Sequence, residues 1–167
     1  MLVTISDVHL TDGTSGTTID SNAFNIFRER LKDLAYAASD REVNGKEIYR
    51  PVKEIHLLLL GDILDVIRST RWLQDDVRPW HDPTSKVFIK KVRDNTGAIV
   101  TNNAQALGVF RSLGQSGFDI QATKPDTGEK AHVKVFIYYA VGTLCTKLPS
   151  TIPRFLTSYM DIPITTR

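Results

Sequence analysis

The sequence lacks several features that mark particular classes of protein. It has a single cysteine, Cys145, in 167 residues, so no disulfide can form within the chain and a reducing compartment is favoured. No apolar run approaches the roughly 20 residues needed to span a bilayer. Asp7 and His9 interrupt the first apolar run too early for a signal peptide. The net charge of +2 comes from scattered charges, which makes a nucleic-acid partner improbable and a membrane partner unexpected. We therefore expect a cytoplasmic protein.

What is present indicates one globular α/β domain. The chain is 41% hydrophobic and 24% charged, and its length is sufficient for a substantial core. Strand-like and helix-like patterns alternate in the order β-α-β-α-β, with no internal repeat. Three apolar runs have the length and composition of buried strands: residues 2–6, 54–60 and 132–141.

The burial of these strands and the helices between them can also be predicted. We expect the first strand to be central in a parallel sheet, and the leucines of the second to be buried on both faces. An amphipathic helix should begin at Asp20 or Ser21, with Leu34 among its apolar residues. A second helical pattern begins at Thr84 as one kinked helix or two. Asn44-Gly45 predicts a turn.

The pattern changes after Gly142. Residues 143–167 contain three of the seven prolines and six threonines, without the periodicity of a helix or strand. A strand followed by such a segment is unusual in an α/β protein, where a helix should follow. We therefore divide the chain into an incomplete domain, residues 1–142, and an irregular tail, residues 143–167.

Acidic and histidine side chains follow two of the predicted strands. Asp7 and His9 come after the first strand, and Asp62 comes after the second, preceded by Gly61. In an open α/β sheet, ligands bind outside the carboxyl ends of the strands. On an extended chain, side chains two residues apart point the same way. Asp7, His9 and Asp62 are therefore candidate ligands of a divalent metal such as manganese, iron or zinc.

Each pattern also has a purely structural interpretation. An Asp-x-His pair is common by chance, and Gly-Asp after a strand is often a turn or a helix cap. Asp65 can be a supporting or capping carboxylate, and His56 is better explained as a packed strand residue. The conjunction of both patterns at the ends of two strands, with a helix between them, favours a metal site. Metal centres of this kind catalyse hydrolysis of phosphoesters.

Two stretches resemble the first two motifs of the calcineurin-like metallophosphoesterases, D-x-H and G-D-x-x-D. They are Ile5-Ser6-Asp7-Val8-His9-Leu10 and Gly61-Asp62-Ile63-Leu64-Asp65. The resemblance covers residues 1–142 and implies the N-terminal half of a four-layer α/β/β/α sandwich. It also implies hydrolysis of a phosphomonoester or phosphodiester, carried by a small molecule or a nucleotide, at a centre with two metals.

By the same resemblance, Asp7 and His9 ligate the first metal, Asp62 bridges both metals, and Asp65 has a supporting role. Specificity would come from the loop of residues 68–83. There Trp72, Arg78, Trp80 and His81 could line an entrance, and a role as solvated surface residues is at least as probable.

The later motifs of that family are missing. Where G-N-H-D/E is expected, the chain reads Gly142-Thr143-Leu144-Cys145, and no histidine follows His132. The family pattern then leaves the second metal only Asp62, so we expect at most one metal to be held well. Either the native continuation after Gly142 has been lost, or this is a non-catalytic metal- or ligand-binding relative or an inert fragment. A half-sandwich would leave one sheet face bare, which predicts self-association.

Overall fold

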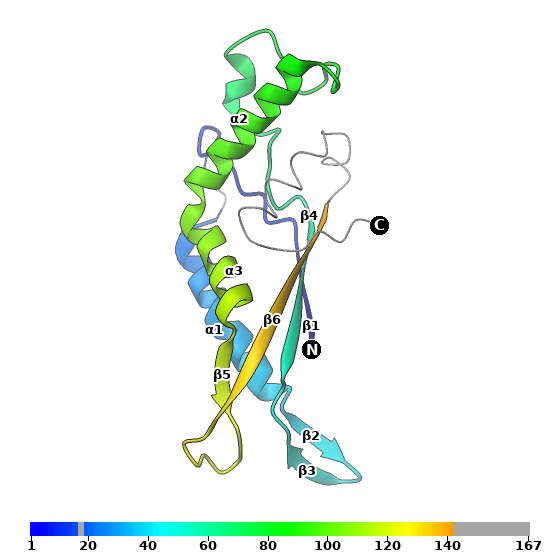
Figure 1. The fold of residues 1–167 in the computed structure, drawn as a ribbon, viewed down its shortest axis with the longest axis vertical. Helices are drawn as coiled ribbons and strands as arrows, with labels where there is room; N and C mark the ends of the chain where they lie inside the picture. The colour runs from blue at the N-terminus through cyan, green and yellow to red at the C-terminus, as the bar shows by residue number, and fades with distance from the viewer. Residues whose placement is uncertain (17–18, 142–167) are drawn as a thin grey trace.

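The computed structural model describes residues 1–16 and 19–141 and has a mixed α/β fold (Figure 1). The elements are β1 (Leu2–Ser6), α1 (Ser21–Ala37), β2 (Asp40–Val43), β3 (Lys46–Tyr49), β4 (Glu54–Gly61), the 3-10 turn η1 (Thr70–Leu73), α2 (Lys86–Asn102), α3 (Ala104–Ser116), β5 (Phe118–Gln121) and β6 (Lys130–Val141). None of the helices in these ranges could cross a bilayer. The predicted tail, residues 143–167, lies outside the described residues.

The main sheet has the strand order β1-β4-β6-β5. β1 pairs with β4 and β4 with β6 in parallel, whereas β5 runs antiparallel to β6. The predicted parallel β-α-β-α-β core is therefore confirmed. The prediction that β1 would be a central strand is wrong. β1 pairs only with β4 and forms one edge of the described sheet. Strands β2, β3 and β5 are too short and too polar to have been recognised from their sequence.

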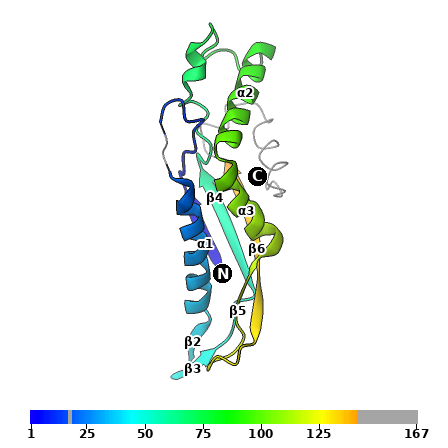
Figure 2. The ribbon, with the colours of Figure 1, turned by 90° about the vertical axis from the view of Figure 1, so that its left-hand side faces the viewer.

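One face of the sheet is buried under helices α1 and α3, which lie side by side in Figure 2. On β4, Ile55, Leu57 and Leu59 are fully buried and alternate with partly exposed residues. The prediction that β4 would be buried on both faces is thus wrong for the described residues. The predicted burial of β1 is also wrong, because its residues alternate between exposed and half-buried, and Leu2 is 68% exposed.

The opposite face of the sheet carries a row of side chains in register. Leu2 pairs with His56 and His56 with Phe136, so the three residues share that face. The ring of His56 stacks on Phe136 at 5.3 Å between centroids, and its Nδ1 lies 3.0 Å from the hydroxyl of Tyr138. His56 is therefore a packed strand residue, as predicted.

Helix α1 begins where its sequence predicts. The carboxylate of Asp20 accepts a hydrogen bond from the Asn22 N–H at 2.7 Å and caps the first turn. Phe24 is buried and meets the ring of Phe110 edge-on, with centroids 5.5 Å apart. Leu34 is 51% exposed, so the buried stripe of α1 is narrower than its apolar pattern.

Asn103 separates α2 from α3, which resolves the expected kinked helix into two. The break lies at neither of the glycines inside the pattern, Gly97 and Gly108. The side-chain amide of Asn103 donates hydrogen bonds to the carbonyls of Ile99 at 2.8 Å and Thr11 at 2.7 Å. The helix junction is therefore tied to the loop that follows β1.

The β2–β3 hairpin projects from the end of the sheet at which the parallel strands begin (Figure 1). Its predicted turn is present, with φ angles of 54° at Asn44 and 72° at Gly45, as a two-residue hairpin loop requires. At its base, the buried hydroxyl of Ser39 donates to the Ala35 carbonyl at 2.7 Å and accepts from the Val52 N–H at 3.0 Å. The hairpin thus has a fixed attachment to α1 and β4.

Replacing Leu57 by alanine tests this assignment of the core. Leu57 is fully buried beneath the helices, so Leu57→Ala should lower the free energy of unfolding by about 2–5 kcal/mol. Leu2→Ala, at an exposed position of the adjacent strand, should change it by less than about 0.5 kcal/mol. Urea denaturation of both variants measures the difference. Equal effects of the two substitutions would contradict the assigned faces of the sheet.

Candidate functional site

The two motifs lie side by side beyond the ends of β1 and β4. Backbone hydrogen bonds continue the parallel pairing past both strands. The N–H groups of Asp7, His9 and Leu10 donate to the carbonyls of Leu60, Asp62 and Ile63 at 3.2, 2.9 and 2.9 Å, respectively. The N–H of Asp65 donates in the other direction, to the carbonyl of Leu10 at 2.9 Å. Residues more than fifty positions apart in sequence are thereby held in one register. The site is built at the carboxyl edge of the parallel strands, where α/β proteins bind ligands.

The backbone of the first motif is not extended. Asp7 and His9 each have a φ of 52°, in the left-handed region that residues other than glycine seldom adopt. The prediction that the two side chains would point the same way along an extended strand is therefore wrong, because β1 ends at Ser6. Each such residue costs about 1–3 kcal/mol, and strain of this kind concentrates at functional sites.

Gly61 allows the two motifs to approach. Its φ is 71°, and a Cβ atom built on it would lie 2.4 Å from Oδ1 of Asp7. Any other residue would therefore displace the Asp7 carboxylate, which rests against the backbone one residue before Asp62. The glycine is required here both for its conformation and for the space it leaves.

Asp65 orients the ring of His9. Oδ2 of Asp65 lies 3.0 Å from Nδ1 of His9, and the Asp65 side chain is 12% exposed against 34% for His9. An ionised carboxylate only accepts hydrogen bonds, so this contact places a proton on Nδ1. Asp65 also accepts from the Arg68 N–H at 3.2 Å and lies 3.4 Å from its Nε. Carboxylates commonly hold metal-binding histidines in this way, although a metal role for Asp65 stays a prediction.

Asp62 has a buried acceptor without a partner. Its Oδ1 atom is shielded from solvent and accepts no hydrogen bond within the described part of the chain. Leaving a buried polar atom unsatisfied costs about 1–3 kcal/mol, and more when the group is charged. Such an atom calls for a specific explanation, and a bound cation is one.

The structure does not gather the three predicted ligands into one set. Within residues 1–16 and 19–141, no group of three or more His, Cys, Asp or Glu side chains is arranged to hold a metal ion. Asp7 lies against Gly61, His9 lies against Asp65, and Asp62 is half-buried with its Oδ1 shielded from solvent. The backbones of the motifs meet, but metal binding by all three residues requires their side chains to converge further.

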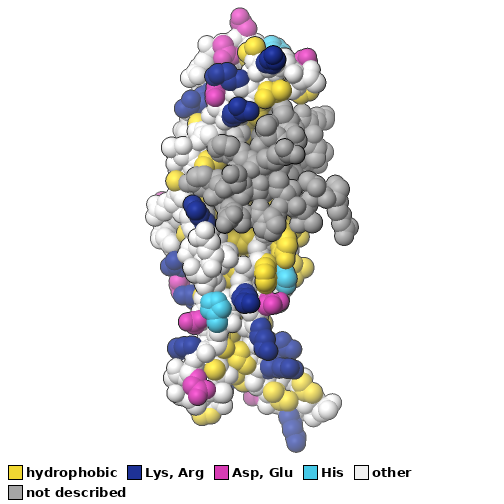
Figure 3. All heavy atoms as spheres, in the orientation of Figure 1, with side chains coloured by type: hydrophobic (Ala, Val, Ile, Leu, Met, Phe, Trp, Pro, Cys, Tyr) yellow, Lys and Arg dark blue, Asp and Glu magenta, His cyan; other side chains and the backbone are white. Residues whose placement is uncertain are grey.

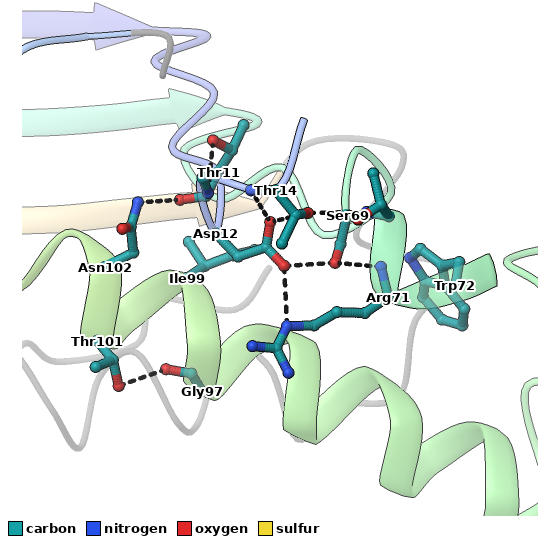
Figure 4. Close-up of polar contacts among 12 residues, drawn as sticks. Thr11, Asp12, Thr14, Ser69, Arg71, Trp72, Gly97, Ile99, Thr101 and Asn102 are labelled. Atoms are coloured by element: carbon teal, nitrogen blue, oxygen red, sulfur yellow. Dashed lines mark hydrogen bonds and ion pairs between the residues drawn. The ribbon is translucent and has the colours of Figure 1, made fainter. Parts of the chain in front are cut away.

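A clamp centred on Asp12 was not recognised from the sequence (Figure 4). Its buried carboxylate accepts from the Ser69 hydroxyl at 2.5 Å and the Thr14 hydroxyl at 2.6 Å, and pairs with Nε of Arg71 at 3.2 Å. The only local signal is the Asp-Gly-Thr turn sequence at Asp12. Its long-range partners come from the segment after the second motif. The clamp therefore holds together the loops that follow both motifs.

Helices α2 and α3 complete this support. The side-chain amides of Asn102 and Asn103 donate to the carbonyl of Thr11 at 3.1 Å and 2.7 Å, and Figure 4 shows the first of these contacts. Thr11 itself is buried, and its hydroxyl donates to the Gly16 carbonyl at 2.7 Å. The loop after His9 is thus fixed on both sides.

Two of the four residues considered for an entrance have structural roles instead. Trp72 is buried, and its Nε1 donates to the Val66 carbonyl at 2.8 Å. The guanidinium of Arg78 donates to backbone carbonyls of its own loop, among them that of Trp72 at 2.7 Å. Trp80 is 78% exposed and His81 is exposed. The prediction that all four residues line an entrance is therefore wrong.

No family model, curated protein or solved structure matches this chain. The resemblance to metallophosphoesterases therefore stays a prediction from the two motifs.

Substituting Gly61 tests the contact between the motifs. Gly61→Ala should lower the free energy of unfolding by about 1–3 kcal/mol, because alanine is strained at positive φ and its Cβ meets the Asp7 carboxylate. Gly97→Ala is the matched control: it lies inside α2 with nothing within 4 Å of the new Cβ, and should stabilise the protein by about 0.5–1 kcal/mol. A Gly61→Ala protein as stable as the wild type would contradict the geometry. Urea denaturation measures both.

The Asp12 clamp predicts a dependence of stability on pH. Burial acts to raise the pKa of Asp12, but hydrogen bonds from Ser69 and Thr14 and the charge of Arg71 outweigh it and hold the pKa below its ordinary value of 3.8. The ionised clamp therefore stabilises the fold fully above the unfolded pKa, and this stabilisation is lost as the pH falls through the folded pKa.

Asp12→Asn should thus be less stable than the wild type at neutral pH and lose less further stability between about pH 5 and pH 2. Urea denaturation across that range measures both slopes. Asp76→Asn, at an exposed loop position, should change stability at neutral pH by less than about 0.5 kcal/mol. Parallel profiles for Asp12→Asn and the wild type would disprove the role of the clamp.

Proposed function

We propose that this chain carries the first-metal side of a metal-dependent phosphoester hydrolase that acts on a phosphomonoester or phosphodiester. The observation that carries the proposal is the buried Oδ1 of Asp62, which has no hydrogen-bond partner in the described part of the chain. It belongs to the second motif, at the carboxyl edge of the parallel strands, where hydrogen bonds hold the two motifs in register. A cation there would replace the missing partner of a buried carboxylate.

The nearby groups have the chemistry that such a cation requires. Asp65 accepts the Nδ1 proton of His9 and so directs Nε2 to act as the ligand atom. Asp7 presents a carboxylate beside Gly61. One imidazole and two carboxylates suit manganese, iron or zinc. When bound, a divalent cation supplies a water of lowered pKa and polarises the phosphoryl oxygen.

In this proposal, the residues of the chain bind and position. Asp62 and Asp7 supply negative charge to the cation, and Asp65 fixes the orientation and the protonated nitrogen of His9. The clamp of Asp12 with Ser69 keeps the two loops at a constant separation. A ligand set held by such outer contacts loses less freedom on binding, which raises its affinity.

The four-layer α/β/β/α sandwich is part of the same proposal. The sheet face opposite α1 and α3 carries Leu2 and Phe136, which are 68% and 39% exposed. In a four-layer sandwich a second sheet covers this face. Because uncovered apolar surface promotes association, self-association of the chain is part of the proposal.

A second candidate is metal binding without turnover. It is favoured by the sequence Gly142-Thr143-Leu144-Cys145, which offers neither the asparagine nor the histidine of the family's third motif. The two candidates share the first-metal site and differ in whether a phosphoester is cleaved there.

Titration calorimetry with Mn²⁺ and hydrolysis of bis(4-nitrophenyl) phosphate test both candidates. The wild-type chain should bind Mn²⁺ and cleave the diester, and Asp62→Asn should abolish both, because Asp62 holds the buried ligand atom. Asp76→Asn removes an exposed carboxylate outside both motifs and should alter neither. Mn²⁺ binding without cleavage would support the second candidate. No binding, or equal binding by Asp62→Asn, would exclude both.

Asp65→Asn provides a graded test of the same site. Asparagine keeps the size of the side chain but removes the charge that holds the Nδ1 proton of His9. Loss of such a supporting carboxylate typically weakens metal binding by about 10–100-fold without abolishing it. An unchanged dissociation constant for Mn²⁺ would show that His9 is not a ligand.

A further inference from the structure

A cavity of about 510 Å³ opens at the end of the sheet opposite the two motifs. It lies where β4 begins and the β2–β3 hairpin is attached, and its lining includes Arg41, Arg50, Lys53 and Glu54. Figure 3 shows Lys and Arg side chains gathered around the base of the hairpin. The volume is within the range of about 300–1,000 Å³ typical of small-molecule sites.

The charge of the cavity is predominantly positive. Three cationic side chains line it and only one carboxylate, that of Glu54. Among the described residues, Arg41, Arg50 and Lys53 make no ion pair or side-chain hydrogen bond. The donors of these three side chains are therefore available to a ligand. Two of them are guanidinium groups, whose planar donors match the oxygens of a phosphate.

The nearest acidic residue of the hairpin does not offset this charge. Asp40 precedes Arg41, but its carboxylate is paired with Nζ of Lys124 at 2.5 Å. The hydrogen bond to Asp40 raises the pKa of Lys124, so the pair stays intact at neutral pH. Lys124 also lies 5.5 Å from the ring centre of Tyr49, over its face. The other two acidic residues of the hairpin, Glu42 and Glu47, pair with each other across the strands and do not line the cavity.

The backbone holds the two arginines in a fixed relation. Arg41 is on β2, where it pairs with Ile48 of β3. The N–H of Arg50 donates to the Ser39 carbonyl at 2.7 Å. Val52, which is buried, and Ala38, which is half-buried, add apolar surface to the same cavity. The site therefore combines a cationic rim with an apolar part.

We propose that this cavity binds a small organic phosphate. Arg41, Arg50 and Lys53 would hold the phosphate, and Ala38 and Val52 would contact the organic part. The site goes beyond the proposed hydrolase and is separate from it. β4 has eight residues, so at about 3.3 Å per residue the cavity lies ~26 Å from Asp62 along the strand.

Titration calorimetry of the full chain with adenosine monophosphate (AMP) tests this proposal. AMP combines a phosphate group with an adenine ring whose faces are apolar. The protein is first stripped of metal on a chelating resin, so that the proposed hydrolase cannot consume the ligand. The wild type should bind AMP, and the double variant Arg41→Gln/Arg50→Gln should bind at least about tenfold more weakly, because it loses two charge-assisted contacts. Inorganic phosphate should bind more weakly than AMP.

Lys46→Gln is the matched control, because Lys46 is an exposed cation of the same hairpin that does not line the cavity. Lys46→Gln should change the dissociation constant for AMP by less than about twofold relative to the wild type, compared with about tenfold for the double variant. Circular dichroism verifies that each variant is folded.

The proposal would be overturned by an absence of AMP binding, by equal weakening in Lys46→Gln and the double variant, or by binding of a long oligonucleotide without binding of AMP. Asp62→Asn should retain full AMP binding. Loss of binding in Asp62→Asn would place AMP at the metal motifs and overturn the proposal, whereas the hydrolase test stands or falls independently.

Discussion

The parallel pairing of β1 with β4, continued beyond both strands, is the constraint on which the rest of the described structure depends. It runs from Leu2 opposite His56 to Leu10 opposite Leu64, and it carries the D-x-H and G-D-x-x-D stretches along in register. The continuation is possible only because Gly61 leaves room for the Asp7 carboxylate. It also requires Asp7 and His9 to adopt left-handed backbone angles, whose cost must be met by the surrounding contacts.

Three sets of contacts hold the motifs and the loops that follow them. The Asp12 clamp joins the loop after β1 to η1, the amide of Asn103 joins the same loop to the helix junction, and Asp65 holds His9. Together they explain how a strained segment persists in a chain whose stability is a small difference between large terms. The buried oxygen of Asp62 that has no hydrogen-bond partner in the described part of the chain lies next to these contacts.

The two ends of the sheet differ in chemistry. The carboxyl end carries Asp7, Asp62 and Asp65, which we propose as a cation site. The opposite end carries a cavity lined by Arg41, Arg50 and Lys53, and suits an anion. A net charge of +2 for the whole chain conceals this separation, because the average cancels local fields that act over about 8–10 Å in physiological salt. The distribution of charge in space is therefore more informative about ligands than its sum.

The sequence by itself determined the features that depend on neighbours along the chain. These are the strand at Leu2–Ser6, the Asp20 cap, the Asn44-Gly45 turn, the β-α-β-α-β order of the main elements and the two motifs. Only the tertiary structure placed β1 at an edge of the described sheet, left one face of β4 partly open, and set the relative positions of the two motifs. It also decided the Asp12 clamp and the basic cavity. The physical reason is range: periodicity, caps and turns act over a few residues, whereas His9 meets Asp65 and Asp12 meets Ser69 across separations of 56 and 57 residues, which only the folded register brings together.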